Sequence, residues 1–366
     1  MTPRLRSGVP LSDDMITLDA HCDSPSQMFR LRDFGKDNPS PAQVDFPKMR
    51  RGGLDASFFA LYVPARLAAV EAYEYALRLL ECLQEQVRAN SDTVAFAFSS
   101  EDVRSNKAKG LVSILIGLEN ASPLGESLEL LHEFHERGVR YITLTHSRDN
   151  QVCDSCTGDG RWGGLSPFGR ELVVEMNRIG MLVDLAHCSD RTVEDVLSLS
   201  TSPVVSTHGC CRSLNPHRRN LPDSLIRGIA AGGGVVGMSI YPPFLDAGAA
   251  RLLSSPEMEK RLSVEDGFIA SPSDPEKRKA WENLQSELLS MPRPGVEKLV
   301  EHIGHAVSLA GAAHVGIGTD FDGIEVPAAG LDDVSRMGLI WSSLAVAGYT
   351  KEEISGIAGG NFLRLI

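Results

Sequence analysis

The chain has 366 residues, and 36 Lys and Arg against 48 Asp and Glu give a formal net charge of −12 at pH 7. Hydrophobic residues make up 42% of the chain and charged residues 23%, which is an ordinary globular composition and excludes a disordered protein. The acidic balance argues against a nucleic-acid partner, because proteins that bind nucleic acid carry a basic surface.

The sequence also bears on membranes and compartment. No apolar run reaches the roughly 20 residues that cross a bilayer, so we expect no membrane partner. The N-terminal MTPRLRSGVPLSDDM lacks the apolar core of a secretory signal, and the C-terminus lacks the spacer and tail of a lipid-anchor signal. Seven cysteines without small-domain spacing favour a reducing compartment. We therefore expect a cytoplasmic protein.

Eight short apolar runs, most of them rich in Val, Ile, Leu or Thr, predict buried strands. In chain order they are residues 15–20, 56–63, 111–118, 139–145, 181–186, 203–207, 234–240 and 315–319. Helical patterns fill most of the intervals, at residues 66–89, 126–137, 167–178, 190–199, 222–231 and 296–310. Ser166 and Ser189 precede two of these helices as expected N-cap residues.

Strands that alternate with helices predict a parallel sheet, and eight such units predict closure into a (β/α)8 TIM barrel. The alternative is an open doubly wound sheet, which normally has a Gly-rich phosphate-binding turn after its first strand, whereas this chain has DAHCD there. Residues 244–294, between the seventh and eighth strands, are polar and Pro-dotted, with a helix expected near 275–289. We interpret them as a rim insertion in a single 1–366 barrel domain, serving as a lid or as a contact in a homodimer.

A histidine or a carboxylate follows six of the eight predicted strands. In a barrel the C-terminal ends of the strands converge on one face, which is where barrel enzymes keep their active sites. One or two such residues are expected by chance, but six indicate a metal centre. The residues are His21 with Asp23, Glu119, His146, His187, His208 and Asp320.

The residue types fit metal chemistry. His21 and Asp23 lie two apart and so share one face of a strand, where a nitrogen and an oxygen ligand suit zinc. Glu119 ends an apolar run, where a carboxylate is costly unless it is paired, and we expect it to bridge two cations. His187 and His208 end neighbouring strands and predict a second metal site, although either histidine alone is better explained as a core residue.

Two further residues are candidates for catalysis. His146 is placed to polarise a substrate carbonyl, with a structural histidine at the mouth of the barrel as the alternative. Asp320 ends the last strand and is expected to carry chemistry, whereas Asp322, followed by Gly323, is expected to cap a turn.

The motifs together resemble the membrane (renal) dipeptidase family, the M19 metallopeptidases, in its bacterial branch. The matching segments, in the order of that family, are DAHCD, GLEN, VRYITLTH, GLSPFG, VDLAHCS, STH, RNLPD, HVGIGTDFDG and GGNFLRL. The resemblance implies an amidohydrolase-like (β/α)8 barrel that binds two zinc ions. It also implies hydrolysis of free dipeptides, including those with a D-residue at the C-terminal position, by a hydroxide that bridges the metals.

The resemblance assigns roles residue by residue. It implies that His21 and Asp23 bind one zinc ion, that His187 and His208 bind the other, and that Glu119 bridges the two. It makes His146 a substrate contact, Arg219 the group that holds the substrate carboxylate, and Asp320 the catalytic acid and base. Many family members have Glu-Gly-Gly where this chain has Glu119-Asn120-Ala121, and we expect Asn120 to narrow the substrate pocket.

Two alternatives remain at this stage. The same metal centre could serve a related amidohydrolase that acts on N-acyl amino acids or lactams. A non-catalytic binding protein on the same barrel would be expected to have lost metal ligands, yet all six strand-end positions retain them.

Overall fold

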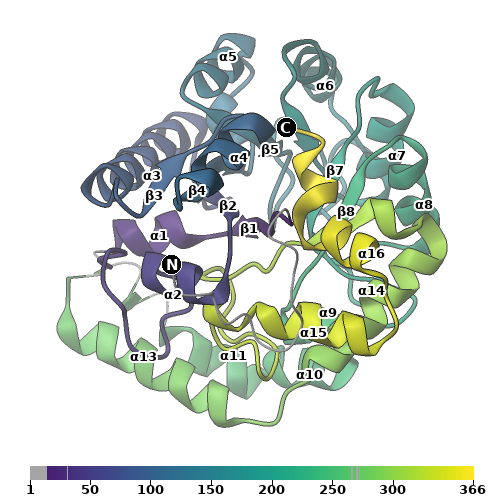
Figure 1. Cartoon of the computed structure of the whole chain (residues 1–366). Helices are drawn as coiled ribbons and strands as arrows, with labels where there is room; N and C mark the ends of the chain where they lie inside the picture. Colours follow the sequence, from purple (N-terminus) through teal and green to yellow (C-terminus); the bar gives the residue numbers. More distant parts are fainter. Residues whose placement is uncertain (1–14, 31, 265–266, 269–270, 272) are drawn as a thin grey trace.

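The computed structural model describes residues 15–366 except 31, 265–266, 269–270 and 272. Eight parallel strands follow one another around a barrel, and helices surround it (Figure 1). The strands are β1 (Leu18–Cys22), β2 (Ala56–Tyr62), β4 (Val112–Glu119), β5 (Val139–Thr143), β6 (Leu182–Asp184), β7 (Val205–Gly209), β8 (Val235–Met238) and β9 (Val315–Ile317). Each overlaps one of the eight predicted runs, so the predicted barrel is confirmed.

The barrel closes just beyond the ends of β9 and β1. The backbone N–H of Asp23 donates to the carbonyl of Phe321 at 2.8 Å, and the N–H of Asp320 donates to the carbonyl of His21 at 3.0 Å. Asp19 joins the same strands, because its carboxylate accepts from the backbone N–H of Thr319 at 2.8 Å. The hydrogen bonds that close the barrel therefore involve the backbone of three predicted site residues, His21, Asp23 and Asp320.

The six predicted helices are present on the outside of the barrel. They are α3 (Ala69–Ala89), α5 (Leu128–Glu136), α6 (Pro167–Ile179), α7 (Asp190–Leu199), α8 (Asp223–Ala231) and α14 (Val296–Ala310). Both predicted N-caps are confirmed: the Ser166 hydroxyl accepts from the N–H of Gly169 at 2.9 Å, and the Ser189 hydroxyl accepts from that of Thr192 at 3.1 Å. These bonds satisfy N–H groups that the first turn of a helix leaves open.

Several short elements have no counterpart in the sequence prediction. Strand β3 (Val94–Phe96) pairs with β4 outside the ring of eight, and at three residues it is too short to give an apolar run. Helix α4 (Ser100–Ala108) buries only Val103 and Asn106, so it has no apolar stripe. Two short helices precede β2, namely α1 (Ser24–Phe29) and α2 (Phe46–Gly52).

Side chains that point into the barrel fill its interior, among them Phe58, Leu115 and Tyr141. Helices α15 (Gly338–Val346), α16 (Lys351–Ser355) and α17 (Asn361–Leu363) lead across one end of the barrel to the C-terminus, which lies beside α4 (Figure 1). Phe362 fills this end so tightly that a Cβ atom on Gly316 would lie 2.5 Å from its ring. Gly359 packs against the start of β1, so the C-terminal segment covers the end where strands begin.

Residues 242–290, between β8 and α14, contain four described helices: α9 (Pro242–Leu245), α10 (Ala247–Leu253), α11 (Pro256–Leu262) and α13 (Pro275–Ser290). The helix expected near 275–289 is confirmed as α13. Leu253, Met258 and Trp281 belong to a small apolar cluster that also includes Val326. The segment therefore packs through side chains of its own and reaches the loop that follows β9.

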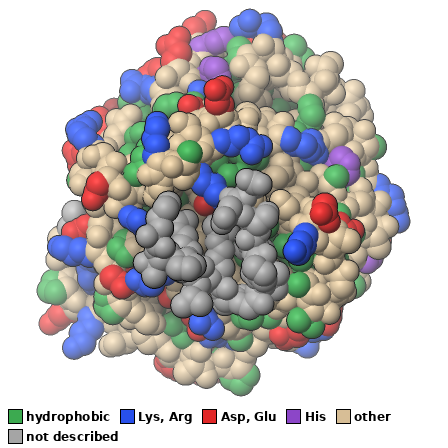
Figure 2. Space-filling model, in the orientation of Figure 1, with side chains coloured by type: hydrophobic (Ala, Val, Ile, Leu, Met, Phe, Trp, Pro, Cys, Tyr) green, Lys and Arg blue, Asp and Glu red, His purple; other side chains and the backbone are tan. Residues whose placement is uncertain are grey.

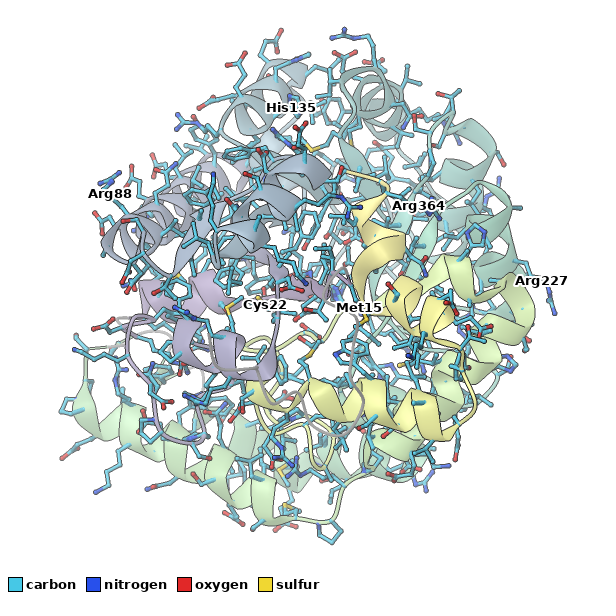
Figure 3. All side chains as sticks on the ribbon, in the orientation of Figure 1. Met15, Cys22, Arg88, His135, Arg227 and Arg364 are labelled. Atoms are coloured by element: carbon cyan, nitrogen blue, oxygen red, sulfur yellow. The ribbon has the colours of Figure 1, made fainter. Side chains whose placement is uncertain are left out.

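One face of the outer surface is mixed in charge. On the face shown in Figure 2, acidic and basic side chains are interspersed. Arg88 and Arg227 point outward at the periphery, whereas Cys22 lies inside the ring of helices and is 1% exposed (Figure 3). Among the described helices, none combines the length and the apolar character that a membrane span requires.

Candidate metal centre

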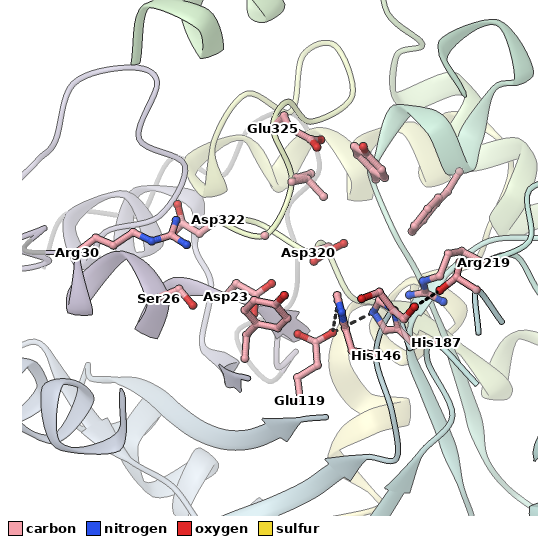
Figure 4. Close-up of a pocket in the computed structure, with 17 residues that line it drawn as sticks. Asp23, Ser26, Arg30, Glu119, His146, His187, Arg219, Asp320, Asp322 and Glu325 are labelled. Carbon is pink, nitrogen blue, oxygen red and sulfur yellow. Dashed lines mark hydrogen bonds and ion pairs between the residues drawn. The ribbon is translucent and has the colours of Figure 1, made fainter. Parts of the chain in front are cut away.

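The predicted site residues converge around the carboxylate of Glu119 at the C-terminal end of the barrel (Figure 4). Glu119 Oε2 lies 3.6 Å from His21 Nε2, and Glu119 Oε1 lies 3.0 Å from His187 Nε2 and 3.6 Å from His208 Nε2. The two oxygens of one buried carboxylate thus face different histidines. Asp23 completes the first side, with its Oδ2 atom 3.9 Å from His21 Nε2.

The donor atoms fit a bound cation. His21 Nε2, Asp23 Oδ1 and Glu119 Oε2 are buried and have no hydrogen-bond partner among the described residues. The Nε2 atoms of His187 and His208 face each other at 2.9 Å. Buried polar atoms without partners are costly, and imidazole nitrogens with carboxylate oxygens are the ligands that zinc prefers. Three groups have donor atoms within 4.8 Å of one another: His21 with Asp23 and Glu119, His21 with His208 and Asp320, and Glu119 with His146 and His187.

Charge also favours a cation beside His21. Burial by itself would lower the pKa of His21, but the nearby carboxylates of Glu119 and Asp23 raise it well above its usual value. On the other side, burial and the positive charge of neighbours such as Arg219 and His21 lower the pKa values of His187 and His208 well below theirs. These two rings are therefore neutral and have lone pairs to donate to a metal.

Hydroxyl groups contact the Nδ1 atoms of two of the histidines, whose Nε2 atoms face Glu119. The Tyr141 hydroxyl lies 2.8 Å from His21 Nδ1, and the Thr207 hydroxyl lies 3.0 Å from His208 Nδ1. The Thr207 hydroxyl donates to the buried carboxylate of Asp184 at 2.8 Å, so it accepts from His208. A proton on Nδ1 leaves the Nε2 lone pair free, which is the tautomer that a metal requires.

The backbone turns sharply where three of these strands end. His187 and Asp320 both have φ 67°, and Asn120 has φ 78°. Non-glycine residues rarely adopt this left-handed conformation, which costs free energy and clusters at functional sites. His187 and Asp320 are predicted site residues themselves, and Asn120 directly follows Glu119.

A cavity of about 360 Å³ opens above Glu119 and is lined by His146, His187, Arg219 and Asp320 among others. Arg219 donates from Nη2 to the carbonyl of His208 at 3.2 Å, while its buried Nε has no partner among the described residues. Burial and the charge of Arg219 lower the pKa of His146 to about 3, so its ring is neutral. Burial raises the pKa of Asp320 well above its usual value, and Asp23 and Glu119 add to the rise.

Asn120 lies outside the described lining of this cavity. Its amide donates to the carbonyl of Val63 at 2.9 Å, and its oxygen accepts from the hydroxyl of Ser122 at 2.9 Å and from the amide of Asn150 at 3.0 Å. The side chain thus ties together the loops that follow β2, β4 and β5. The structure brings the other predicted site residues together around the cavity. Asn120 instead holds the loops next to them and does not narrow the described cavity.

Sequence reasoning passed over Tyr141, Thr207 and Asp184, although all three lie in the quoted motifs or next to their histidines. Thr207 immediately precedes His208, which is the only local signal for its contact. Tyr62 was also missed: it lines the cavity, and its ring lies 4.8 Å from that of His146, edge to face. Apart from the Thr207–His208 pair, these contacts join segments that are distant in the sequence, so no periodicity within one segment reveals them.

Comparison with known proteins identifies the family. The model of "Membrane dipeptidase (Peptidase family M19)" matches residues 6–366. The chain belongs to this family. It is a metallodipeptidase on a (β/α)8 barrel, as the motifs predicted.

Among curated relatives, the chain is 32% identical to dipeptidase aclJ of Aspergillus oryzae over 333 residues, which cover 88% of this chain and 69% of that protein. The probable dipeptidase PvdM of Pseudomonas aeruginosa is 28% identical, with a TM-score of 0.80 over 96% of this chain and 95% of that one. A metallopeptidase of Rhodobacter sphaeroides, liganded with a phosphinate mimic of the dipeptide L-Ala-D-Ala, is 25% identical, with a TM-score of 0.80 over 96% and 99%. Because fungal and bacterial proteins both appear, the bacterial branch stays a prediction.

Proposed function

We propose that this protein is a binuclear zinc dipeptidase in which His21 and Asp23 hold one ion, His187 and His208 hold the other, and Glu119 bridges them. The observation that carries the proposal is the position of Glu119, whose two oxygens face different histidines at 3.0–3.6 Å. Two zinc ions, when bound, would polarise the scissile carbonyl and make water nucleophilic near neutral pH. Side chains of the protein supply the acid and base, the donor to the oxyanion and the group that binds the substrate carboxylate.

Asp320 acts as the acid and base of the reaction. Its carboxylate lies 3.9 Å from His21 Nε2 and lines the cavity, and its raised pKa favours uptake of a proton. It takes a proton from the attacking water and passes it to the leaving amine. His146 is neutral and its buried Nδ1 has no partner among the described residues, so the ring is able to donate to the developing oxyanion.

Arg219 binds the C-terminal carboxylate of the substrate. Its unpartnered Nε lies on the same guanidinium as Nη2, and a planar guanidinium fits a carboxylate through two parallel hydrogen bonds. This contact selects substrates that have a free carboxylate on the residue after the scissile bond, as free dipeptides do. The ligand of the Rhodobacter sphaeroides relative, a mimic of L-Ala-D-Ala, supports acceptance of a D-residue at the C-terminal position.

Zinc content and a substrate panel test the proposal. We expect two zinc ions per chain by elemental analysis, and turnover of L,L- and L,D-dipeptides by the zinc-loaded protein. N-acyl amino acids and lactams serve as the comparison class, because a related amidohydrolase on the same centre would prefer them. Turnover of that class alone, or a protein that retains no metal, contradicts the proposal.

A further inference from the structure

One wall of the cavity runs from Arg219 through two aromatic rings to a second carboxylate (Figure 4). The guanidinium carbon of Arg219 lies 5.2 Å from the centre of the Phe244 ring. The rings of Phe244 and Tyr241 meet edge to face, with centroids 4.9 Å apart. The side chain of Tyr241 hydrogen-bonds to the carboxylate of Glu325. The carboxylate of Glu325 therefore lies on the same wall as Arg219, the predicted carboxylate-binding group.

One oxygen of the Glu325 carboxylate lacks a hydrogen-bond donor among the described residues. Its Oε2 atom is buried and has no hydrogen-bond partner among the described residues. Burial raises the pKa of this carboxyl, and the bond from Tyr241 only partly opposes the rise. A buried carboxylate oxygen without a donor is costly, and an incoming cation would remove that cost.

The other carboxylates in the described lining are already accounted for. Asp23, Glu119 and Asp320 belong to the metal centre. Asp322 accepts from Arg32 Nη1 at 2.7 Å and from the Ser24 hydroxyl at 2.9 Å. Glu325 is the lining carboxylate that neither the mechanism nor a described salt bridge uses.

We propose that Glu325 selects dipeptides whose C-terminal residue carries a long cationic side chain, such as lysine. The inference rests on the proposed function, because Arg219 must first hold the carboxylate of that residue. The methylene stem of lysine would then pack along Phe244 and Tyr241, and its ammonium would donate to Glu325. The N-terminal amino group is a poorer occupant, since in a dipeptide it lies across the scissile carbonyl from the carboxylate.

The test compares alanyl-lysine with alanyl-norleucine, each in L,L and L,D form, on the zinc-loaded protein. Norleucine has the same straight stem without the ammonium. We expect kcat/KM to favour the lysine dipeptide by roughly 10- to 100-fold, the effect of one hydrogen bond to a charged group. Glu325→Gln should bring this ratio close to one. Glu257→Gln, an exposed carboxylate on α11, is the matched control and should keep the wild-type ratio.

The outcomes separate the two proposals. A wild-type ratio near one, or a preference that survives Glu325→Gln, overturns the inference and leaves the dipeptidase function standing. A Glu325-dependent preference for lysyl-alanine over alanyl-lysine overturns the assigned position in the substrate. If the zinc-loaded protein hydrolyses no dipeptide at all, the proposed function fails, and the inference fails with it.

Discussion

Two hydroxyl groups determine which nitrogens of the buried histidines face Glu119. Tyr141 contacts His21 Nδ1 at 2.8 Å, and Thr207 contacts His208 Nδ1 at 3.0 Å while it donates to Asp184. Each contact fixes a ring before any ion arrives, so the protein does not have to order that ligand when it binds metal. Such outer contacts commonly control metal affinity as strongly as they control geometry.

Tyr141→Phe removes one of these hydroxyls and keeps the ring. We expect zinc to bind roughly 10- to 100-fold more weakly, because His21 is then free to take the other tautomer and to tilt. Competition with a zinc chelator measures the affinity directly, without reference to turnover. Tyr73→Phe is the control, since it removes a hydroxyl that contacts Glu133 at 2.8 Å on the outside of the barrel. Equal zinc affinity in both variants would show that the Tyr141 hydroxyl does not orient His21.

Arg219→Lys tests recognition of the substrate carboxylate. Lysine keeps the charge but loses the fork that makes two parallel hydrogen bonds. We expect KM to rise about tenfold for free dipeptides, the equivalent of one charge-assisted hydrogen bond. KM for the corresponding C-terminal amides should change much less, because they offer no carboxylate. A similar rise for both substrate classes would count against this role for Arg219.

At the scale of the elements, contacts between neighbouring strands position the site. Gly117 on β4 leaves the space that the Tyr141 ring on β5 occupies: a Cβ atom at Gly117 would lie 2.1 Å from Tyr141 Cζ. The glycine in the GLEN motif therefore makes room for the residue that holds His21. This explains a motif position that has no side chain to offer to the chemistry.

Gly117→Ala should destabilise the fold by about 1–3 kcal/mol, the usual cost of overpacking a tight core, and should also move Tyr141. Chemical denaturation measures the change in the free energy of unfolding. Gly304→Ala on α14 is the opposite case, because its nearest contact would be Tyr349 Oη at 3.5 Å. We expect it to raise stability by about 0.5–1 kcal/mol, since alanine favours a helix more than glycine does. Equal effects of the two substitutions would contradict this account.

The elements differ in how well the sequence predicts them, for physical reasons. The barrel strands are buried on both faces and give apolar runs, and helices such as α6 combine an apolar stripe with a capping serine. Strand β3 and helix α4 were missed because they bury few residues. The convergence on Glu119 followed from strand ends alone, whereas the placement of Asn120 and the wall that ends at Glu325 depend on loops whose paths no local pattern encodes.

At the scale of the whole molecule, His302 joins three parts of the chain. It lies on α14 and is 1% exposed. Its Nδ1 accepts from the backbone N–H of Cys211, in the loop after β7, at 3.0 Å. Its Nε2 then carries the proton and donates to the carbonyl of Leu245, at the end of α9, at 3.2 Å. The same ring thus links the barrel to the segment between β8 and β9, near Phe244 on the cavity wall.

This link makes stability depend on pH. Burial lowers the pKa of His302 below its usual value of 6.5, although the bond to Leu245 partly opposes the shift. Below pH 6.5 the unfolded chain gains a proton at this position before the folded protein does, so stability present above pH 6.5 falls as the pH decreases. His302→Gln offers an amide that accepts and donates at similar positions but does not titrate. We therefore expect the urea midpoint of this variant to fall less than that of the wild type between about pH 7.5 and pH 5.5, and parallel curves would show that His302 titrates alike in the folded and unfolded states.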